Sequence, residues 1–376
     1  MELVAKKYKQ TDVGIIPIDW DVKRLLDVSD FSNGKAHEQS IDEAGDFVVV
    51  NSKFISTEGE IFKNSNQAIS PLAKGDITLV MSDIPNGKAL AKCYLIEIDN
   101  KYTLNQRICS IKTRVCDNVF LFYVLNRNKY FLSFDSGSGQ TNLRRNEVLD
   151  CPLAIPPTIA EQTAIATALS NIDELISQTE KLIDKKIAIK QGVMQELLKP
   201  KEGWVMKKLG DVCKIIKGQL ITDSSRVHGD IPVIAGGKKP AYFHNLPNRF
   251  DKTITISGSG ASAGYVSFHD YPIFASDCST ISESLNYDIE FIYYWLQLNQ
   301  NKIFNMQTGG AQPHIHPSDL NPMEINLPSV KKQQEISLII TDIVSDIETY
   351  LTILQKLKLQ KQGMMQALLT GKIRLI

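Results

Sequence analysis

One segment of the chain matches a pattern found in serine hydrolases. Gly260, Ser262 and Gly264 form a G-x-S-x-G motif, in which a serine nucleophile occupies a sharp turn between a strand and a helix. A β-rich run at 253–256 precedes the motif, but residues 265–268 favour a second strand. We therefore predict a glycine-rich hairpin loop, either a plain turn or one whose amides and hydroxyls approach phosphates or base edges. A serine hydrolase that uses Ser262 is a remote alternative.

Other patterns of reactive residues are equally weak. His314 and His316 could ligate a metal, but no cysteine or carboxylate cluster stands nearby at ligand spacing, so no metal site is predicted. The six cysteines are scattered without a Cys-x-x-Cys pair, which is typical of reduced thiols in a cytoplasmic protein. The chain has neither a P-loop nor an Asn-Pro-Pro-aromatic tetrad, so it is not expected to hydrolyse ATP or to methylate DNA by itself.

Basic and amide side chains crowd the expected loops and have the chemistry of nucleic-acid contacts. Such side chains bind phosphates and make bidentate hydrogen bonds to base edges. The net charge is zero, which argues against a non-specific polyanion binder and requires that any DNA-binding charge be segregated on one face. The candidate DNA-binding residues are Lys35, His37, Lys53, Lys88, Arg107, Gln140, Asn142, Arg144 and Arg145 in the first half, and Lys217, Gln219, Lys238, Lys239, Lys252, Ser259, Gln312 and His314 in the second.

The sequence contains one unit twice. Six residues of the opening segment recur 184 positions later, namely Trp20, Lys23, Leu25, Asp27, Val28 and Gly34. Residues 157–198 match 328–369 at an offset of 171, and the stretches that begin at Lys190 and Lys361 are identical at seven of nine positions. Gln140 and Gln312 lie in similar loops before each of these segments. The bodies between the matching segments diverge, which suggests two recognition modules of different specificity in one repeated frame.

The bodies are predicted to be α+β domains with a mainly β core. Short β-rich runs bounded by Gly, Asn, Asp and Pro support this prediction. The expected strands are 46–50, 76–80 and 94–98 in the first body, and 231–234, 253–256, 264–268 and 272–275 in the second. Each body also has one aromatic helix candidate, 119–131 and 289–303.

A long amphipathic helix is predicted after each body. Apolar residues recur at spacings of three and four along 159–198 and along the second copy, the pattern of a helix with coiled-coil character. About 40 residues give a rod of roughly 60 Å, and its single apolar stripe needs a partner. If the two helices pair antiparallel, the bodies lie at opposite ends of the rod and could reach DNA sites up to about 18 base pairs apart.

The repeated frame resembles the specificity subunits of type I restriction-modification systems. The resemblance covers both halves and lies in the opening from Tyr8 to Trp20, in Pro156-Pro-Thr-Ile-Ala-Glu161-Gln162 before the first helix, and in the ending from Met365 to Gly371. The second copy departs from the pattern. It reads Lys331-Lys-Gln333-Gln-Glu335 in place of Ala160-Glu161-Gln162, so the Glu-Gln pair is expected to be shifted or lost there.

The resemblance implies a division into four segments. Residues 1–157 and 200–327 would be target recognition domains that each read half of a split DNA sequence. Residues 158–199 and 328–376 would be helical regions that form an antiparallel coiled coil, set the spacer and dock two methyltransferase subunits. The residues expected to serve the helix pairing and docking are Ile165, Ile172, Ile176, Gln191, Met194, Ile336, Ile343, Ile347, Gln362 and Met365.

The resemblance also implies a cytoplasmic chain without catalytic residues or cofactors. S-adenosylmethionine, ATP and Mg²⁺ are expected on the methyltransferase subunits and on the motor-nuclease subunits that bind through them. No apolar run approaches the ~20 residues that would cross a membrane. A coiled-coil scaffold with two protein-binding domains and no role on DNA is the second alternative.

Overall fold

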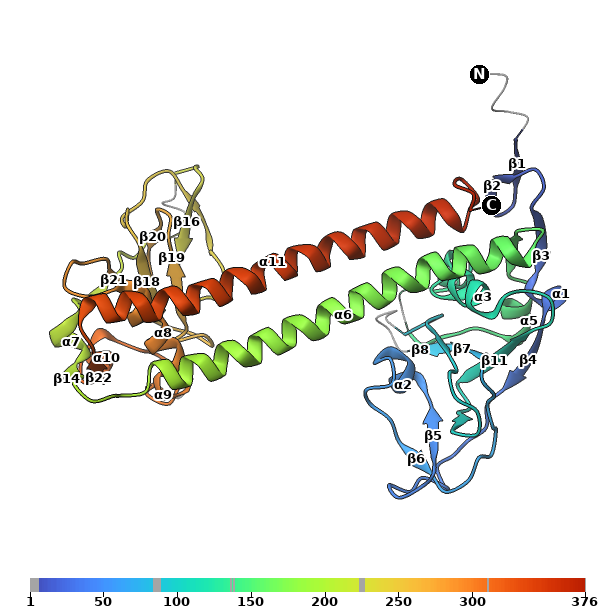
Figure 1. Ribbon diagram of the computed structural model, residues 1–376, viewed down its shortest axis with the longest axis horizontal. Coiled ribbons are helices and arrows are strands. Elements are labelled where there is room, and N and C mark those ends of the chain that lie inside the picture. Colours follow the sequence, from blue (N-terminus) through green and yellow to red (C-terminus); the bar gives the residue numbers. More distant parts are fainter. Residues whose placement is uncertain are drawn as a thin grey trace. The chain divides into compact units, whose positions relative to one another are not determined.

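Two long helices organise the chain in the computed structural model, which describes residues 7–83, 89–135, 137, 139–222, 227–309 and 311–375. Helix α6 spans Ile159–Leu197 and helix α11 spans Val330–Leu368, with 39 residues each (Figure 1). The chain forms two compact units. Unit 1 comprises Met1–Thr179 and Leu354–Ile376, and unit 2 comprises Glu180–Ile353. Each long helix therefore contributes one part to each unit.

The body of unit 1 contains two main sheets, a four-stranded sheet in the order β4-β11-β7-β9 and a three-stranded sheet in the order β10-β5-β6. Its strands are β1 (Tyr8–Thr11), β2 (Gly14–Pro17), β3 (Asp21–Arg24), β4 (Ser29–Asn33), β5 (Phe47–Val50), β6 (Asn64–Ser65), β7 (Ile77–Val80), β8 (Ser82–Asp83), β9 (Cys93–Leu95), β10 (Tyr102–Leu104), β11 (Ile108–Thr113), β12 (Thr141–Asn142) and β13 (Pro152–Ile155). Its short helices are α1 (Leu25–Val28), α2 (Ser52–Ser56), α3 (Asn118–Leu125), α4 (Lys129–Leu132) and α5 (Arg145–Leu149).

Unit 2 repeats this plan, with sheets in the orders β15-β21-β18-β19 and β17-β16-β20. Its strands are β14 (Val205–Lys208), β15 (Ile216–Lys217), β16 (Ile231–Ile234), β17 (Tyr242–His244), β18 (Thr253–Ser257), β19 (Val266–His269), β20 (Phe274–Ala275), β21 (Cys278–Ser282) and β22 (Glu324–Leu327). Its short helices are α7 (Leu209–Val212), α8 (Ile289–Leu298), α9 (Gln300–Phe304) and α10 (Pro317–Leu320). The predicted α+β class with mainly β bodies is confirmed, although β9, β19 and β20 differ from the expected strands by two or three residues at one end.

The repeat extends into the bodies, whose sequences diverge. In unit 1 the parallel pair β5/β10 joins Val50 to Leu104, and in unit 2 the parallel pair β16/β20 joins Ile234 to Ala275. The structure also explains why two of the recurring positions, Gly34 and Gly218, are glycines. A Cβ on Gly34 would collide with the carbonyl of Asn105. A Cβ on Gly218 would collide with the carbonyl of Ser276 in the same way, so close backbone approach requires glycine at both places.

Each aromatic helix predicted from the sequence is in fact two short helices. In unit 1 the break between α3 and α4 passes through Arg127, whose φ of 56° lies in the left-handed region. The side chain of Asn128 then caps α4 by accepting a hydrogen bond from the amide of Tyr130. In unit 2 Asn299 separates α8 from α9. Asparagine competes with the helical backbone for hydrogen bonds, which explains why both helices stop at this residue type.

Two glutamines tie the long helices to the bodies in the same way. The side chain of Gln162 donates to the carbonyl of Pro156 and accepts from the amide of Asp117, the residue that caps α3. Gln333 donates to Pro328 and accepts from Asp288, the residue that caps α8. The glutamine is therefore retained in the second copy, which corrects the expectation that the Glu-Gln pair is shifted or lost as a whole.

The glutamate before this glutamine is not retained. Glu161 is 3% exposed and forms an ion pair with Arg374 near the end of the chain. The aligned residue in the second copy is Lys332, which is exposed and pairs with Glu335 on its own helix. Arg374 also pairs with Asp19 at 3.0 Å and lies over the ring of the fully buried Trp20. This ion-pair cluster is thus a feature of unit 1 and not of the repeat.

Ion pairs connect α6 and α11 inside each unit. In unit 1 Asp173 of α6 pairs with Lys361 of α11, and Glu161 of α6 pairs with Arg374, which follows the end of α11. In unit 2 Lys186 pairs with Asp346 at 2.7 Å. In unit 1 Ile165 and Leu169 of α6 and Leu368 of α11 also belong to one apolar cluster with Trp20 and Phe120.

All six cysteines are buried free thiols. Burial raises the pKa of Cys151, Cys213 and Cys278 to about 12, which keeps these sulfurs protonated and weakly nucleophilic at neutral pH. None of the helices in the described part of the chain has the length and apolar character that crossing a lipid bilayer requires.

Candidate nucleic-acid interface

Corresponding strands of the two bodies pair in the same register, so residues in the loops of one body can be aligned with residues in the loops of the other. In unit 1 β7 and β11 pair with Val80 opposite Ile108, and in unit 2 β18 and β21 pair with Ser257 opposite Cys278. One step beyond these pairs, the amide of Met81 donates to the carbonyl of Arg107. The amide of Gly258 donates to the carbonyl of Asp277 in the same way. Arg107 and Asp277 therefore occupy equivalent positions, immediately before β11 and β21.

A second pair of contacts shows that the loops that carry Gln140 and Gln312 also occupy equivalent positions. In unit 1 Ser82 lies opposite Asn142 in the β8/β12 pair, and in unit 2 Ser259 lies opposite His314 in an isolated bridge. The weak similarity between the loops that carry Gln140 and Gln312 thus reflects a shared backbone position. We name the two sets of equivalent residues head cluster 1, which is Lys35, Ser82, Arg107, Gln140 and Asn142, and head cluster 2, which is Gln219, Ser259, Asp277, Gln312 and His314.

Head cluster 1 is held by hydrogen bonds among neutral side chains. The hydroxyl of Ser82 donates to Oδ1 of Asn142 at 2.6 Å, and Nε2 of Gln140 donates to Oγ of Ser82 at 2.7 Å. The two cationic members are exposed. Lys35 is anchored through its backbone, since its amide donates to Leu104, three residues before Arg107. The cluster therefore presents positive charge and amide groups from a fixed platform.

Head cluster 2 borders a cavity of about 310 Å³. Ser259, Asp277 and His314 line it, together with Lys217 and His316. The hydroxyl of Ser259 donates a short hydrogen bond to Oδ2 of Asp277. The imidazole rings of His314 and His316 stack, with centroids 6.1 Å apart and an interplanar angle of 4°. The cavity thus combines an acceptor carboxylate with flat rings, which are groups that can read and stack on a base.

Most of the predicted DNA-binding residues lie on the surface of their own unit. The exposed ones are Lys35, Lys53, Arg107, Gln140, Asn142, Arg144, Arg145, Lys217, Gln219, Lys238, Lys239 and Gln312. Two of these cations rest on aromatic rings, Arg145 over Phe31 at 5.5 Å and Lys238 over Tyr265 at 5.2 Å. Ser259 and His314 are half-buried. Lys88 lies outside the described residues.

Two of the predicted residues do not fit a DNA-contacting surface. His37 is 1% exposed, and its ring nitrogens bond the hydroxyl of Thr103 and the carbonyl of Lys35, so it is a core residue that shapes the loop. Lys252 forms an ion pair with Glu290 at 2.6 Å. It precedes the first residue of β18, whereas Ser259 follows the last, so Lys252 lies at the other end of that strand.

Ser82 and Asp277 are not among the residues predicted from the sequence to bind DNA. Neither is a basic or amide residue, and neither belongs to a matched segment. The signal that finds Ser82 is the offset of 177 between the strands β7 and β18, because the second residue after each strand is then Ser82 or Ser259. Asp277 is found in the same way, since it precedes β21 as Arg107 precedes β11. That offset becomes visible only when the strand registers are known.

The structure weighs against the serine hydrolase alternative. The G-x-S-x-G segment lies in the hairpin between β18 and β19, which confirms the hairpin prediction, and no helix follows it. Residues outside the hairpin stabilise it, because the side chains of Gln300 and Gln307 donate hydrogen bonds to the carbonyls of Gly264 and Ala263. In the described part of the chain, no group of three or more His, Cys, Asp or Glu side chains is arranged to hold a metal ion.

The helix residues predicted to dock partners divide into two classes. Ile165, Ile172, Met194, Ile336 and Ile347 are buried within their own units, so they are not available to another chain. Ile165 belongs to a core cluster of unit 1, and Met194 and Ile336 belong to the core cluster of unit 2. Ile176, Ile343 and Met365 are half-buried, and Gln191 and Gln362 are exposed. The expectation of docking through the five buried side chains is therefore corrected, and the exposed glutamines remain candidates.

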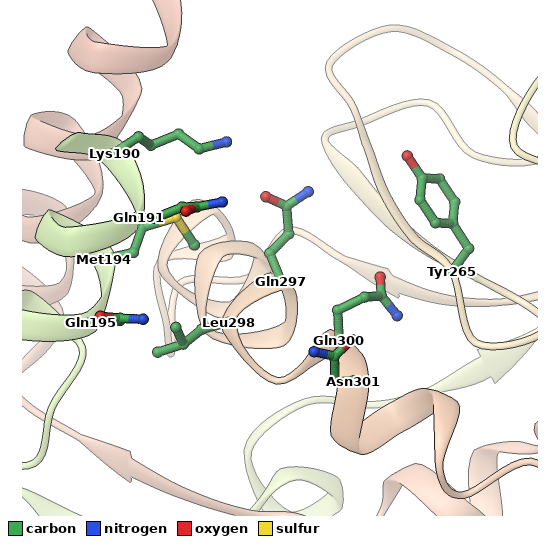
Figure 2. Close-up of a pocket in the computed structure, with 9 residues that line it drawn as sticks. All are labelled: Lys190, Gln191, Met194, Gln195, Tyr265, Gln297, Leu298, Gln300 and Asn301. Carbon is green, nitrogen blue, oxygen red and sulfur yellow. The ribbon is translucent and has the colours of Figure 1, made fainter. Parts of the chain in front are cut away.

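A surface cavity of about 460 Å³ in unit 2 includes one of these glutamines. Lys190, Gln191, Met194 and Gln195 of α6 line one side of it. In Figure 2, Lys190 and Gln191 extend from this helix toward Gln297, and Tyr265 lies beyond Gln297. The remaining lining residues are Leu298, Gln300 and Asn301. Gln and Asn side chains form most of the wall of this cavity.

Comparison with known proteins places these features in a family. The model of the type I restriction modification DNA specificity domain matches residues 17–189 and 201–359. The chain is 25% identical over 417 residues to the MjaX protein of Methanocaldococcus jannaschii, named as a type I restriction enzyme specificity subunit, and the match covers 98% of this chain and 97% of that protein. It is 23% identical over 408 residues to the MjaVIII specificity subunit of the same organism, with coverage of 96% and 94%.

A solved structure shows the same fold. The crystal structure of a type I restriction-modification S subunit from M. genitalium superimposes with a TM-score of 0.69 at 19% identity, and the match covers 96% of this chain and 98% of that one. The two family matches coincide with the two copies of the repeat, and the relatives are matched over nearly their whole length. The chain therefore belongs to the type I restriction-modification DNA specificity family, as a non-catalytic specificity subunit with two recognition domains.

Proposed function

We propose that each body reads one half of a bipartite DNA target through its head cluster. The observation that carries this proposal is that the two bodies have the same register but different side chains at the equivalent positions. Because the backbone is shared, the two head clusters would approach DNA in the same orientation, and their side chains would determine which base pairs each one binds. Residues 1–157 and 200–327 would then be the two target recognition domains.

The length of the helical regions 158–199 and 328–376 would set the spacer between the half-sites. Helix α6 is continuous from unit 1 into unit 2, and 39 residues at 1.5 Å each give about 58 Å. We propose that this helix length sets the distance between the two half-sites. We propose that α6 and α11 form an antiparallel coiled coil for this purpose, and the ion pairs inside each unit support this pairing.

Two modification subunits would dock on the repeated ends of the helices. Gly192 and Gly363 occupy matching positions inside α6 and α11, yet a Cβ on either would meet no atom within 4 Å. Glycine costs a helix interior roughly 0.5–1 kcal/mol relative to alanine, and no atom that a Cβ at either place would have to avoid is found among the described residues. Close approach of a second chain explains both glycines, and their exposed neighbours Gln191 and Gln362 would supply matching polar contacts.

The remaining chemistry would belong to the partners. Family members act with DNA and with modification and restriction subunits, and we propose the same for this chain in the cytoplasm. S-adenosylmethionine would be held by two methyltransferase subunits, and ATP and Mg²⁺ by partner subunits that include the motor-nuclease subunits bound through them. This chain would contribute recognition and spacing without a cofactor of its own.

The test is to map methylated sites in cells that express the chain with its methyltransferase partner. The wild-type complex should yield one split motif with two different halves. A chain that carries the first body in both positions should yield a motif whose two halves have the same sequence. Two unlike halves from that variant would contradict the assignment of one body to one half-site.

A salt titration of duplex binding separates this proposal from a coiled-coil scaffold. A DNA-binding complex loses affinity with a slope of roughly −0.9 per phosphate contact in a plot of log affinity against log salt. A scaffold with two protein-binding domains would give no specific binding and a slope near zero. The titration should use the complex with the methyltransferase, because the chain alone has no net charge.

A further inference from the structure

The equivalent positions of the two head clusters differ in the chemistry that distinguishes base pairs. Both clusters contain a serine after the strand and a glutamine in the loop, so these residues are common to the two heads. The remaining positions hold Lys35, Arg107 and Asn142 in unit 1, and Gln219, Asp277 and His314 in unit 2. The largest change is from Arg107 to Asp277, where a cationic donor is replaced by an anionic acceptor.

Arg107 is free to bind a ligand. Its side chain is exposed, and within the described residues its guanidinium makes no hydrogen bond or ion pair. Its backbone is fixed, since its carbonyl accepts from Met81 at the start of the ladder between β7 and β11. A guanidinium carries five N–H donors in a planar fork and no acceptor. In the major groove, this arrangement matches the O6 and N7 acceptors of guanine.

Asp277 has the opposite requirement. Its Oδ2 accepts from the hydroxyl of Ser259, which fixes the orientation of the carboxylate. The residue lines the cavity of about 310 Å³, and no hydrogen bond to Oδ1 is formed among the described side chains. An ionised carboxylate is an acceptor only, so it can pair with an exocyclic amino group and repels the acceptor edge of guanine. In the major groove such amino groups belong to cytosine and adenine, and carboxylates are typical partners of the cytosine N4 group.

We infer that Arg107 and Asp277 determine specificity at equivalent positions of the two half-sites, where Arg107 selects guanine and Asp277 selects a base with an exocyclic amino group, in the first place cytosine. This inference rests on the proposed function, since it requires that the head clusters face DNA. It goes further by assigning one base class to one residue in each half. Hydrogen bonds of this kind discriminate against a wrong base by about 10- to 100-fold.

The experiment measures the methylated motif of the complex with its methyltransferase, and the rate of methylation on duplexes that carry every single base-pair change of that motif. Arg107→Gln should reduce the discrimination by about 10- to 100-fold at one guanine of one half-site and leave the other half unchanged. Asp277→Asn should relax one cytosine or adenine position of the other half-site. Asparagine still accepts the hydrogen bond of Ser259, so the loop should keep its fold, and an unchanged melting temperature checks this.

Matched controls separate base reading from charge. Lys112→Gln removes one positive charge at the far end of the same strand β11, and Asp251→Asn removes one negative charge before the far end of β18. Neither should change the motif. The inference is overturned if Arg107→Gln weakens methylation equally on all duplexes, as loss of a phosphate contact would, if the relaxed position is not guanine, or if both half-sites stay the same. A wild-type complex without a split motif would instead overturn the proposed function.

Discussion

The guanidinium of Arg374 donates a hydrogen bond from Nη2 to Oε2 of the buried Glu161 at 2.8 Å. It also reaches Asp19, and its hydrogen bonds lower the pKa of that exposed carboxyl below the usual range. Residues near the two ends of the chain are thereby joined to the start of α6 within unit 1. The second copy has Lys332 at the aligned position, so this contact should matter for unit 1 alone.

The first prediction concerns this ion pair. Glu161→Gln should lower the free energy of unfolding of unit 1 by about 2 kcal/mol, since a hydrogen bond between charged groups is lost and the guanidinium stays partly buried. Urea unfolding followed by tryptophan fluorescence measures the effect, since Trp20 lies in unit 1 while Trp204 and Trp295 lie in unit 2. Lys332→Gln is the matched control and should stay within about 0.5 kcal/mol, because its pair with Glu335 is exposed. Equal effects of the two substitutions would show that Glu161 has no special role.

A second prediction follows from the paired glycines. Gly192→Ala and Gly363→Ala should each raise the free energy of unfolding of the isolated chain by roughly 0.5–1 kcal/mol, since both positions are helical and have open space for a Cβ. Gly192→Leu and Gly363→Leu should leave the isolated chain folded but reduce capture of the methyltransferase subunit. Full capture by the double leucine variant would contradict the docking proposal without affecting DNA recognition.

The third prediction tests whether helix length sets the spacer. Removal of residues 176–182 together with 352–358 takes one facing heptad from each helix and keeps the ion pairs Asp173–Lys361 and Lys186–Asp346. Each helix becomes shorter by about 10 Å, so the spacer of the methylated motif should shrink by about 3 base pairs with both half-sites unchanged. A motif with altered half-sites and the original spacer would contradict this role of the helices.

The fourth prediction concerns pH. Burial lowers the pKa of His269 to about 4, and its ring bonds the hydroxyl of Thr255 at 2.9 Å. The unfolded chain, in which the pKa is near 6.5, binds more protons in this window, so stability is lost as the pH falls from 6.5 toward 4. Between pH 7 and pH 5 the loss from this residue should be about 2 kcal/mol.

The control for this prediction is His269→Gln, which keeps a polar group near Thr255 but cannot titrate. The midpoint of urea unfolding should fall less in the variant than in the wild type over the same pH range. If both proteins lose the same stability, His269 is protonated in the folded state and the predicted linkage is absent.

The sequence alone predicted the repeated architecture because the evidence for it is local. Periodic apolar residues predicted the long helices, which begin at Ile159 and Val330, close to the expected positions. Matching residues such as Trp20 and Trp204 revealed the duplication, and short β-rich runs predicted most strands. The sequence did not predict the break of the aromatic helices at Arg127, because a left-handed φ at that residue is imposed by its surroundings.

Only the tertiary structure showed which side chains can belong to the proposed recognition surface. His37 has the residue type of a DNA ligand, yet its hydrogen bond to Thr103, which is 66 positions away in the chain, places it in the core. No sequence pattern singled out Asp277. The pairing of β18 with β21 places it beside Ser259, at the position that the cationic Arg107 occupies in unit 1. Register between strands depends on contacts far apart in sequence, which is why local patterns determined the frame of this protein while the folded chain determined its heads.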